Sequence, residues 1–145
     1  MDCDTRGDGI GMKEEIKVLL VDDEKLVLRS MEKSLLRAGF DVESAANVTD
    51  ALALFQERMG GASPFDIAIL DLNMPNFEGR EDSNAGLKLL SKLLELQPDF
   101  AVIVLTAFDE VERAKEAVKR GARAYFVKGR EADLIALVDS IVNAA

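Results

Sequence analysis

The feature that most constrains the fold is a regular alternation of short apolar runs with segments of helical periodicity. Residues 16–21, 65–70 and 101–105 are rich in branched apolar side chains, as are strands buried on both faces of a parallel sheet. A weakly alternating run at residues 40–45 and a short apolar run at residues 124–127 predict two more strands, the first near an edge. No Asn-Gly hairpin signal separates the runs, so the order predicts right-handed crossovers and an α/β fold with helices on both faces.

The segments that follow these runs carry apolar residues at helical spacing. Residues 24–38 place Leu28, Met31 and Leu35 on one face, and Gly39 follows as a stop signal. Asn47 or Thr49 can cap a second helix that extends to about residue 58. The remaining helices are predicted at residues 87–96, 109–120 and 131–143, whereas residues 76–86 are polar, aperiodic and typical of a loop.

Composition excludes several kinds of site. The net charge of −9 opposes nonspecific binding to nucleic acid or to anionic membranes. The chain has no histidine, which removes His-based catalytic triads, His metal sites and a phosphohistidine of its own. Cys3 is the single cysteine, so no internal disulfide can form, as suits a cytoplasmic protein. We expect residues 1–14 to be a disordered tail and residues 15–145 to form one domain.

Polar side chains stand where the four strongest strands end. Asp22 and Asp23 follow residues 16–21, Asp71 follows residues 65–70, Thr106 follows the third run and Lys128 the last. The carboxyl ends of parallel strands meet at one edge, which is where open α/β sheets bind their ligands. The sequence therefore predicts carboxylates, a hydroxyl and an ammonium in one shallow crevice.

This set of groups favours phosphoryl chemistry assisted by a metal ion. Neighbouring carboxylates repel one another unless a cation lies between them. Oxygen ligands suit Mg²⁺ or Mn²⁺ rather than zinc, and an aspartate can act as a nucleophile that forms an aspartyl phosphate. Each residue taken alone also has a plain explanation: a helix cap for Asp22 and Asp23, a strand-end hydroxyl for Thr106, and a solvated lysine for Lys128. Their coincidence at one edge favours the site.

Four motifs, in this order and spacing, resemble the receiver domains of bacterial two-component response regulators. They are "VLLVDDE", "IAILDLNMPNFEG", "VLTA" and "GARAYFVKG", and the similarity extends from about residue 16 to the end of the chain. The resemblance implies a flavodoxin-like, doubly wound, five-stranded parallel sheet in the order 2-1-3-4-5, with five helices.

The resemblance also implies a role for each matching position. Asp71 corresponds to the phosphoacceptor. The metal site would take the carboxylates of Asp22, Asp23 and Asp71 and the backbone carbonyl of Asn73, with Mg²⁺ or Mn²⁺ as the cofactor.

The remaining matched residues belong to the phosphoryl group and to the switch. Thr106 corresponds to the switch hydroxyl and Lys128 to the lysine that contacts the phosphoryl group. Tyr125 corresponds to the switch aromatic, although an aromatic residue at such a position, taken alone, is more often a packing residue than a switch. The readout surface would be the last helix-strand-helix face, near residues 114–124 and 134–141.

Two positions depart from the family pattern. Gly129 stands where receivers usually have a proline after the lysine, so the family's cis Lys-Pro bond has no proline to support it here. Glycine can provide the turn by another conformation. Residues 79–86, "GREDSNAG", form an insertion beside the expected site.

The leading hypothesis is a cytoplasmic signalling switch rather than an enzyme with an external substrate. A histidine kinase or histidine phosphotransfer protein would phosphorylate Asp71, and a downstream protein, an output domain or a second copy of the chain would bind the switch face, without direct contact to nucleic acid or membrane. A pseudo-receiver that is never phosphorylated is an alternative raised by Gly129. A haloacid-dehalogenase-like phosphatase is another, but that family requires an acid at the position of Asn73.

Overall fold

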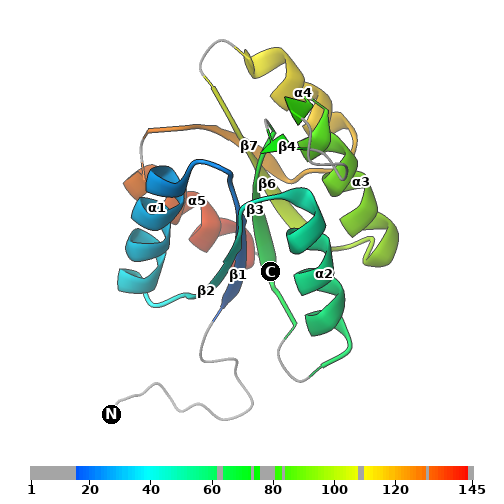
Figure 1. Ribbon diagram of the computed structural model, residues 1–145. Helices are drawn as coiled ribbons and strands as arrows, with labels where there is room; N and C mark the ends of the chain where they lie inside the picture. Colours follow the sequence, from blue (N-terminus) through cyan, green and yellow to red (C-terminus); the bar gives the residue numbers. More distant parts are fainter. Residues whose placement is uncertain are drawn as a thin grey trace.

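The computed structural model describes residues 16–61, 64–72, 74–75, 81–82, 84–107, 110–129 and 131–143, and the predicted alternation of strands and helices is present within them. In this part of the chain the main sheet has five parallel strands: β1 (Lys17–Val21), β2 (Asp41–Ala45), β3 (Ile67–Asp71), β6 (Ala101–Thr106) and β7 (Ala124–Val127). Their spatial order is β2-β1-β3-β6-β7, which confirms the predicted 2-1-3-4-5 topology (Figure 1).

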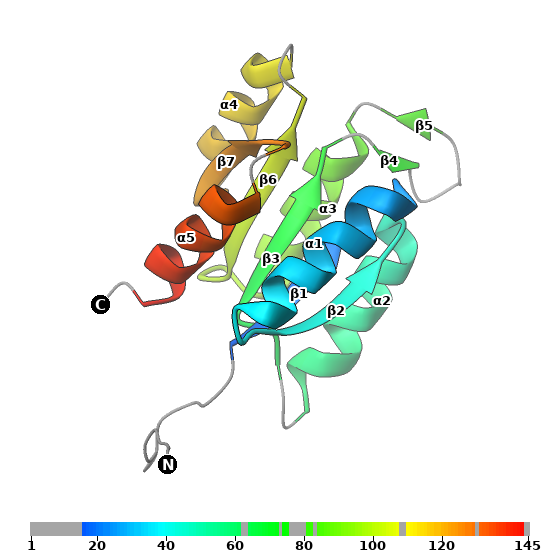
Figure 2. The ribbon, with the colours of Figure 1, turned by 90° about the vertical axis from the view of Figure 1, so that its left-hand side faces the viewer.

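Helices cover both faces of this sheet. They are α1 (Lys25–Arg37), α2 (Val48–Met59), α3 (Ala85–Leu96), α4 (Val111–Lys119) and α5 (Glu131–Val142). Helices α1 and α5 lie on one face and stand in front of the sheet in Figure 2, whereas α2, α3 and α4 cover the other face. The arrangement is the doubly wound α/β fold expected from the sequence.

Each central strand contributes to two hydrophobic cores. Along β1, Val18 and Leu20 pack toward α1 and α5, whereas Leu19 and Val21 pack toward the helices of the opposite face. All four side chains are fully buried. Burial on both faces explains why these strands appear in the sequence as continuous apolar runs rather than as an alternation of apolar and polar residues.

Helix α2 is capped by Asn47, the first of the two predicted capping residues. The side chain of Asn47 accepts a hydrogen bond from the backbone N–H of Asp50 at 2.8 Å. The other candidate, Thr49, lies inside the helix. The two candidates differ because only Asn47 has the extended backbone that directs a capping side chain back to the first turn.

The prediction of a simple loop over residues 76–86 is partly wrong. Strands β4 (Met74–Pro75) and β5 (Glu81–Asp82) pair antiparallel and form a short ribbon near the carboxyl edge of the main sheet (Figure 2). Helix α3 also begins at Ala85 rather than at residue 87.

The early start of α3 depends on close packing of Gly86. A β-carbon at this position would lie 2.6 Å from the Cα of Leu72 and 2.7 Å from the carbonyl oxygen of Asp71. The backbone N–H of Gly86 also donates to the Leu72 carbonyl at 3.3 Å. Glycine is a poor helix former, and here tertiary contact outweighs its intrinsic preference.

Among the described residues, no helix combines the length and the apolar character that a membrane span requires.

Candidate functional site

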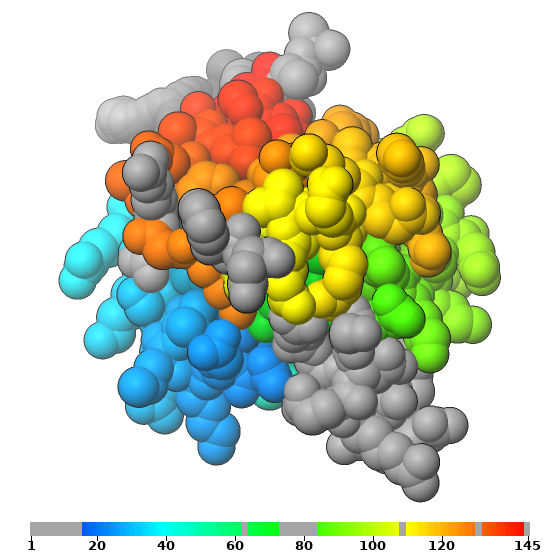
Figure 3. Space-filling model, turned by 90° about the horizontal axis from the view of Figure 1, so that it is seen from above, coloured from blue at the N-terminus to red at the C-terminus, as the bar shows by residue number. Residues whose placement is uncertain are grey.

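The carboxyl edge of the sheet collects the polar residues that the sequence placed at strand ends. Asp22 directly follows β1, and Lys128 directly follows β7. Asp71 and Thr106 are the last residues of β3 and β6. Figure 3 looks down on this edge, where the segments that follow β1 (blue), β6 (yellow) and β7 (orange) surround a common centre. The predicted convergence of these strand ends at one edge of the sheet is therefore present.

Three carboxylates form the floor of the site. One oxygen each of Asp22, Asp23 and Asp71 lies within 4.8 Å of the other two. Asp22 is fully buried and Asp71 is only 3% exposed, whereas Asp23 is partly exposed. Carboxylates this close repel one another strongly in a buried setting. A cation is therefore needed to balance them.

Lys128 supplies one such cation. Its Nζ lies 3.0 Å from Oδ2 of Asp71, 3.3 Å from Oδ2 of Asp22 and 2.8 Å from Oε1 of Glu24. Burial alone would lower the pKa of this ammonium, but the hydrogen bond to Glu24 and the charges of Asp71 and Asp22 outweigh burial and raise the pKa well above its usual value. Lys128 is therefore protonated throughout the physiological pH range.

The two carboxylate oxygens of Asp22 differ in their hydrogen bonding. Oδ1 accepts a hydrogen bond from the backbone N–H of Glu24 at 2.9 Å, which fixes the turn from β1 into α1. Oδ2 is buried and has no hydrogen-bond donor among the described residues, although it lies within ion-pair distance of Lys128. The contact with Lys128 is thus electrostatic attraction without hydrogen-bond geometry, and it leaves a lone pair available.

This donor set fits a hard divalent cation. Asp22, Asp23 and Asp71 offer only oxygen ligands, and Oδ2 of Asp22 is buried without a donor. Mg²⁺ takes one or two carboxylates and retains several waters, so a shallow, partly open cluster suits it, whereas zinc prefers nitrogen and sulfur. Asn73, whose backbone carbonyl is the fourth predicted ligand, lies outside the described residues, so its role stays a prediction.

Thr106 reaches the edge, but its hydroxyl is bonded away from the carboxylates. The side chain is buried, and Oγ1 donates to backbone carbonyls of the following turn, at 3.0 Å from Glu110 O and 3.2 Å from Ala107 O. Because Glu110 is the N-cap residue of α4, this hydroxyl connects the end of β6 with the start of that helix.

Tyr125 does not join the cluster. It lies on the edge strand β7 opposite Val104, and 36% of the residue is exposed. The structure therefore shows an outward, half-exposed aromatic residue, and the switch role assigned by resemblance stays a prediction.

Gly129 provides the turn that follows Lys128. The peptide bond between them is trans, and Gly129 adopts a φ of +117°. Glycine reaches this region readily, whereas proline is locked near −65°. The departure from the family pattern is thus accommodated by a backbone conformation that a proline at this position could not adopt.

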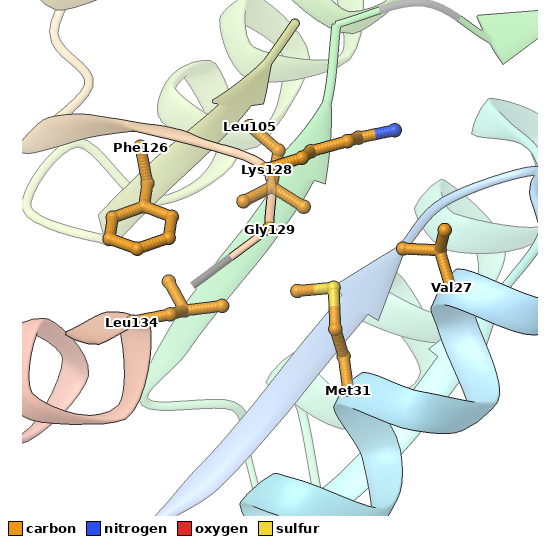
Figure 4. Close-up of a pocket in the computed structure, with 7 residues that line it drawn as sticks. All are labelled: Val27, Met31, Leu105, Phe126, Lys128, Gly129 and Leu134. Carbon is orange, nitrogen blue, oxygen red and sulfur yellow. The ribbon is translucent and has the colours of Figure 1, made fainter. Parts of the chain in front are cut away.

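Two features of the site were not identified from the sequence. One is the contact between Glu24 and Lys128; its only signal was that Glu24 is the third acid in the row that follows β1. The other is an apolar pocket of about 210 Å³ behind Lys128, whose lining comes from α1, β6, β7 and α5 (Figure 4). The lining residues are Val27, Met31, Leu105, Phe126, Lys128, Gly129 and Leu134.

Comparison with known sequences gives a consistent result. The response regulator receiver domain family matches residues 18–139. The C4-dicarboxylate transport transcriptional regulatory protein DctD of Rhizobium meliloti is 34% identical over 116 residues, which cover 80% of this chain and 23% of DctD. The photosynthetic apparatus regulatory protein RegA of Cereibacter sphaeroides is also 34% identical over 116 residues, which cover 80% of this chain and 56% of RegA. The chain thus spans only part of the length of these relatives.

Solved structures agree with the sequence comparison. A response regulator receiver domain protein from Clostridium thermocellum superposes with a TM-score of 0.77 at 29% identity, covering 88% of this chain and 94% of the other. A CheY-like receiver domain protein from Methanospirillum hungatei gives 0.74 at 27% identity, covering 89% and 94%. Together with the sheet order and the carboxyl-edge cluster, these similarities show that the chain belongs to the response regulator receiver domain family of two-component signalling systems.

Proposed function

We propose that Asp71 accepts a phosphoryl group and that the modified aspartate switches the surface formed by α4, β7 and α5. The observation that carries this proposal is the position of Lys128, whose ammonium lies 3.0 Å from the buried carboxylate of Asp71 and 3.3 Å from that of Asp22. A buried aspartate beside a cation and a carboxylate cluster is the arrangement that a metal-assisted nucleophile requires.

In the proposed reaction, the donor is a phosphohistidine on a histidine kinase or a histidine phosphotransfer protein. An oxygen of Asp71 attacks the phosphorus; the new O–P bond forms as the P–N bond breaks, and the bonding electrons leave with the imidazole nitrogen of the donor. This chain has no histidine, so the phosphohistidine must lie outside these 145 residues, unless the donor is a small phosphodonor. The chain promotes only its own phosphorylation and dephosphorylation.

Receiver domains generally bind Mg²⁺ in an acidic pocket, and the candidate ligands here are the carboxylates of Asp22, Asp23 and Asp71. The ion would neutralise the phosphoryl oxygens as they approach the acidic floor. Lys128 adds a second positive charge that faces the acceptor before transfer and the phosphoryl oxygens after it. Its raised pKa keeps this charge in place at neutral pH.

The proposed switch begins at Thr106. To donate to a phosphoryl oxygen, its hydroxyl must leave the carbonyl of Glu110 that it now contacts at 3.0 Å. Release of that bond frees the first turn of α4, and Tyr125 on the neighbouring strand can move into the vacated space. The partner of the resulting face would be a downstream protein, an output domain or a second copy of the chain.

The remaining parts of the proposal concern the setting of the switch. We place it in the cytoplasm, where histidine kinases present their phosphohistidine. Residues 15–145 would form the receiver domain, which slightly exceeds the family match over residues 18–139.

The decisive experiment is phosphorylation by acetyl phosphate with Mg²⁺, read by intact mass and by peptide mapping. The wild-type chain should gain one phosphoryl group on Asp71, and Asp71→Asn should gain none. Asp66→Asn is a matched control, because Asp66 lies at the opposite edge of the sheet, where it accepts from the backbone N–H of Lys17. Stoichiometric labelling of Asp71→Asn at another residue would contradict the assignment.

A further inference from the structure

We propose that Glu24 is a positioning residue that holds the Lys128 side chain over the acceptor carboxylate. The inference rests on the proposed role of Asp71 and adds a residue to its site. Of the three carboxylates that contact the Lys128 ammonium, Glu24 makes the shortest contact, at 2.8 Å. It is also the one on the rim, since its side chain is 59% exposed whereas those of Asp71 and Asp22 are buried.

The backbone of Glu24 is itself fixed on both sides. Its N–H donates to Oδ1 of Asp22 at 2.9 Å, and its carbonyl accepts from the N–H of Leu28 at 2.9 Å as the first hydrogen bond of α1. The residue therefore belongs to the floor of the site through Asp22 and to α1 through Leu28. A side chain that starts from this anchored position can locate the ammonium it contacts.

Lys128 needs such a contact because little else holds its side chain in place. Figure 4 shows its aliphatic stem at the edge of the apolar pocket, with the ammonium directed away from that pocket. The pocket volume of about 210 Å³ means that the stem lacks close packing on this side. The next residue, Gly129, has no side chain and adopts a φ of +117°. The position of Lys128 is thus set mainly at its polar end.

The geometry of the ammonium explains how three carboxylates define that position. An ammonium has three N–H donors. One donates to Glu24 on the rim and one to Asp71 on the floor, while Asp22 attracts the charge at 3.3 Å without hydrogen-bond geometry. With Glu24 in place, one donor is held at the rim and the others face Asp71 and Asp22. Without Glu24, only the two floor carboxylates remain, and the flexible stem can shift along them.

The first test is a double-mutant cycle on the initial rate of Asp71 phosphorylation by acetyl phosphate with Mg²⁺. We expect Glu24→Gln to slow the otherwise wild-type chain about two- to fivefold, the range for a partly exposed ion pair. In a Lys128→Gln background the same change should alter the rate by less than about 1.5-fold, because the group that Glu24 positions is gone.

The cycle separates positioning from bulk charge. Glu95→Gln removes the same charge from an exposed glutamate near the end of α3, outside the proposed site and the switch surface, and it should leave the rate unchanged in both backgrounds. Equal slowing by Glu24→Gln in both backgrounds would overturn the proposal, because Glu24 would then act without Lys128. No slowing in the otherwise wild-type chain would overturn it as well.

The second test needs no phosphorylation. The ammonium signal of Lys128 in proton–nitrogen correlation spectra, assigned by its loss in Lys128→Gln, should be observable in the wild-type chain and in Glu95→Gln, and should broaden or vanish in Glu24→Gln. An unchanged signal in Glu24→Gln would overturn the proposal. A wild-type chain that takes no phosphoryl group at Asp71 would contradict the proposed function, while this spectrum would still decide whether Glu24 holds Lys128.

Discussion

The two edges of the sheet each hold a lysine among carboxylates, and they use it differently. At the amino edge, Nζ of Lys17 lies 2.7 Å from Oδ2 of Asp41 and 3.0 Å from Oε2 of Glu43. Arg58 also forms an ion pair with Glu43 at 2.6 Å, so two positively charged side chains balance the two carboxylates of Asp41 and Glu43. At the carboxyl edge, the ammonium of Lys128 contacts three carboxylates, and Asp23 adds a fourth carboxylate to the cluster.

The difference in charge balance separates a structural ion pair from a reactive site. The pairing of Lys17 with β2 follows from the register, which places Lys17 opposite Asp41, and it ties the edge strand to the centre of the sheet. The hydrogen bond to Asp41 is the main cause that raises the pKa of Lys17, against an opposing effect of burial. Among the described residues, the carboxyl edge has more negative than positive charge, an excess that a protein would not need for stability alone and that is typical of a site that binds a cation.

The largest effect that we expect comes from close packing at the carboxyl edge. Gly86→Ala should lower the free energy of unfolding by about 2 kcal/mol or more, because the new methyl group would overlap the backbone at Asp71 and Leu72. Gly60→Ala, at the end of α2 near the amino edge, has nothing within 4 Å of the added carbon and should change stability by less than about 1 kcal/mol. Urea unfolding measures both. A Gly86→Ala protein as stable as the wild type would show that α3 can retreat from the strand without cost.

Replacing one aspartate by asparagine should have a smaller effect on the free energy of unfolding, and this effect should have opposite signs at the two edges. Without divalent cations, Asp22→Asn should stabilise the fold by about 1 kcal/mol, because it removes one of the crowded buried charges. Asp41→Asn should destabilise it by up to about 1 kcal/mol, because it removes a partner of Lys17 whose side chain is partly exposed.

Magnesium provides the check on this reversal. Added Mg²⁺ should raise the thermal midpoint of the wild type and of Asp41→Asn, since a ligand that binds only the folded chain stabilises it, and should have little effect on Asp22→Asn. Destabilisation by Asp22→Asn in the absence of metal would mean that Lys128 alone balances the carboxyl edge.

The smallest expected effect is on stability at high pH. Both lysines have pKa values raised in the folded chain, so the folded state holds protons that the unfolded state releases. This contribution is complete below the unfolded lysine pKa of about 10.4 and is lost as pH rises from there toward the folded values. The unfolding free energy should therefore fall between about pH 9 and pH 11.5, and the fall should be smaller in Lys128→Met than in Lys17→Met. Chemical unfolding at the two pH values tests this, and equal falls in all three proteins would contradict it.

The sequence was sufficient for the fold class and for the row of residues at the carboxyl edge. Residues 18–21 and 67–70 are apolar throughout because both faces of a central strand are covered by helices. This pattern does not depend on where those helices begin and end. Once the strands are parallel, Asp22, Asp71, Thr106 and Lys128 must emerge at one edge. Their proximity follows from topology and needs no knowledge of side-chain packing.

The contacts of these residues required the three-dimensional structure. The hydroxyl of Thr106 has several acceptors within reach of a strand end, and only the path of the turn before α4 selects Glu110. Residues 81–82 and 85–86 were assigned to a loop because residues 76–86 are polar, aperiodic and bounded by glycine, yet the ribbon and the close approach of Gly86 override local preference.

Local sequence patterns thus account for which residues reach the site. Buried parallel strands appear in the sequence as apolar runs that alternate with helical segments, and the residues of the site stand at the ends of these runs. They do not account for the ion pairs that distinguish the two edges. Lys17 meets Asp41 and Lys128 meets Glu24 across 24 and 104 residues of chain, and partners so distant leave no periodic signal. Such pairs arise only when the sheet closes and brings the charges within a few ångströms, where Coulomb energy and desolvation select the partner.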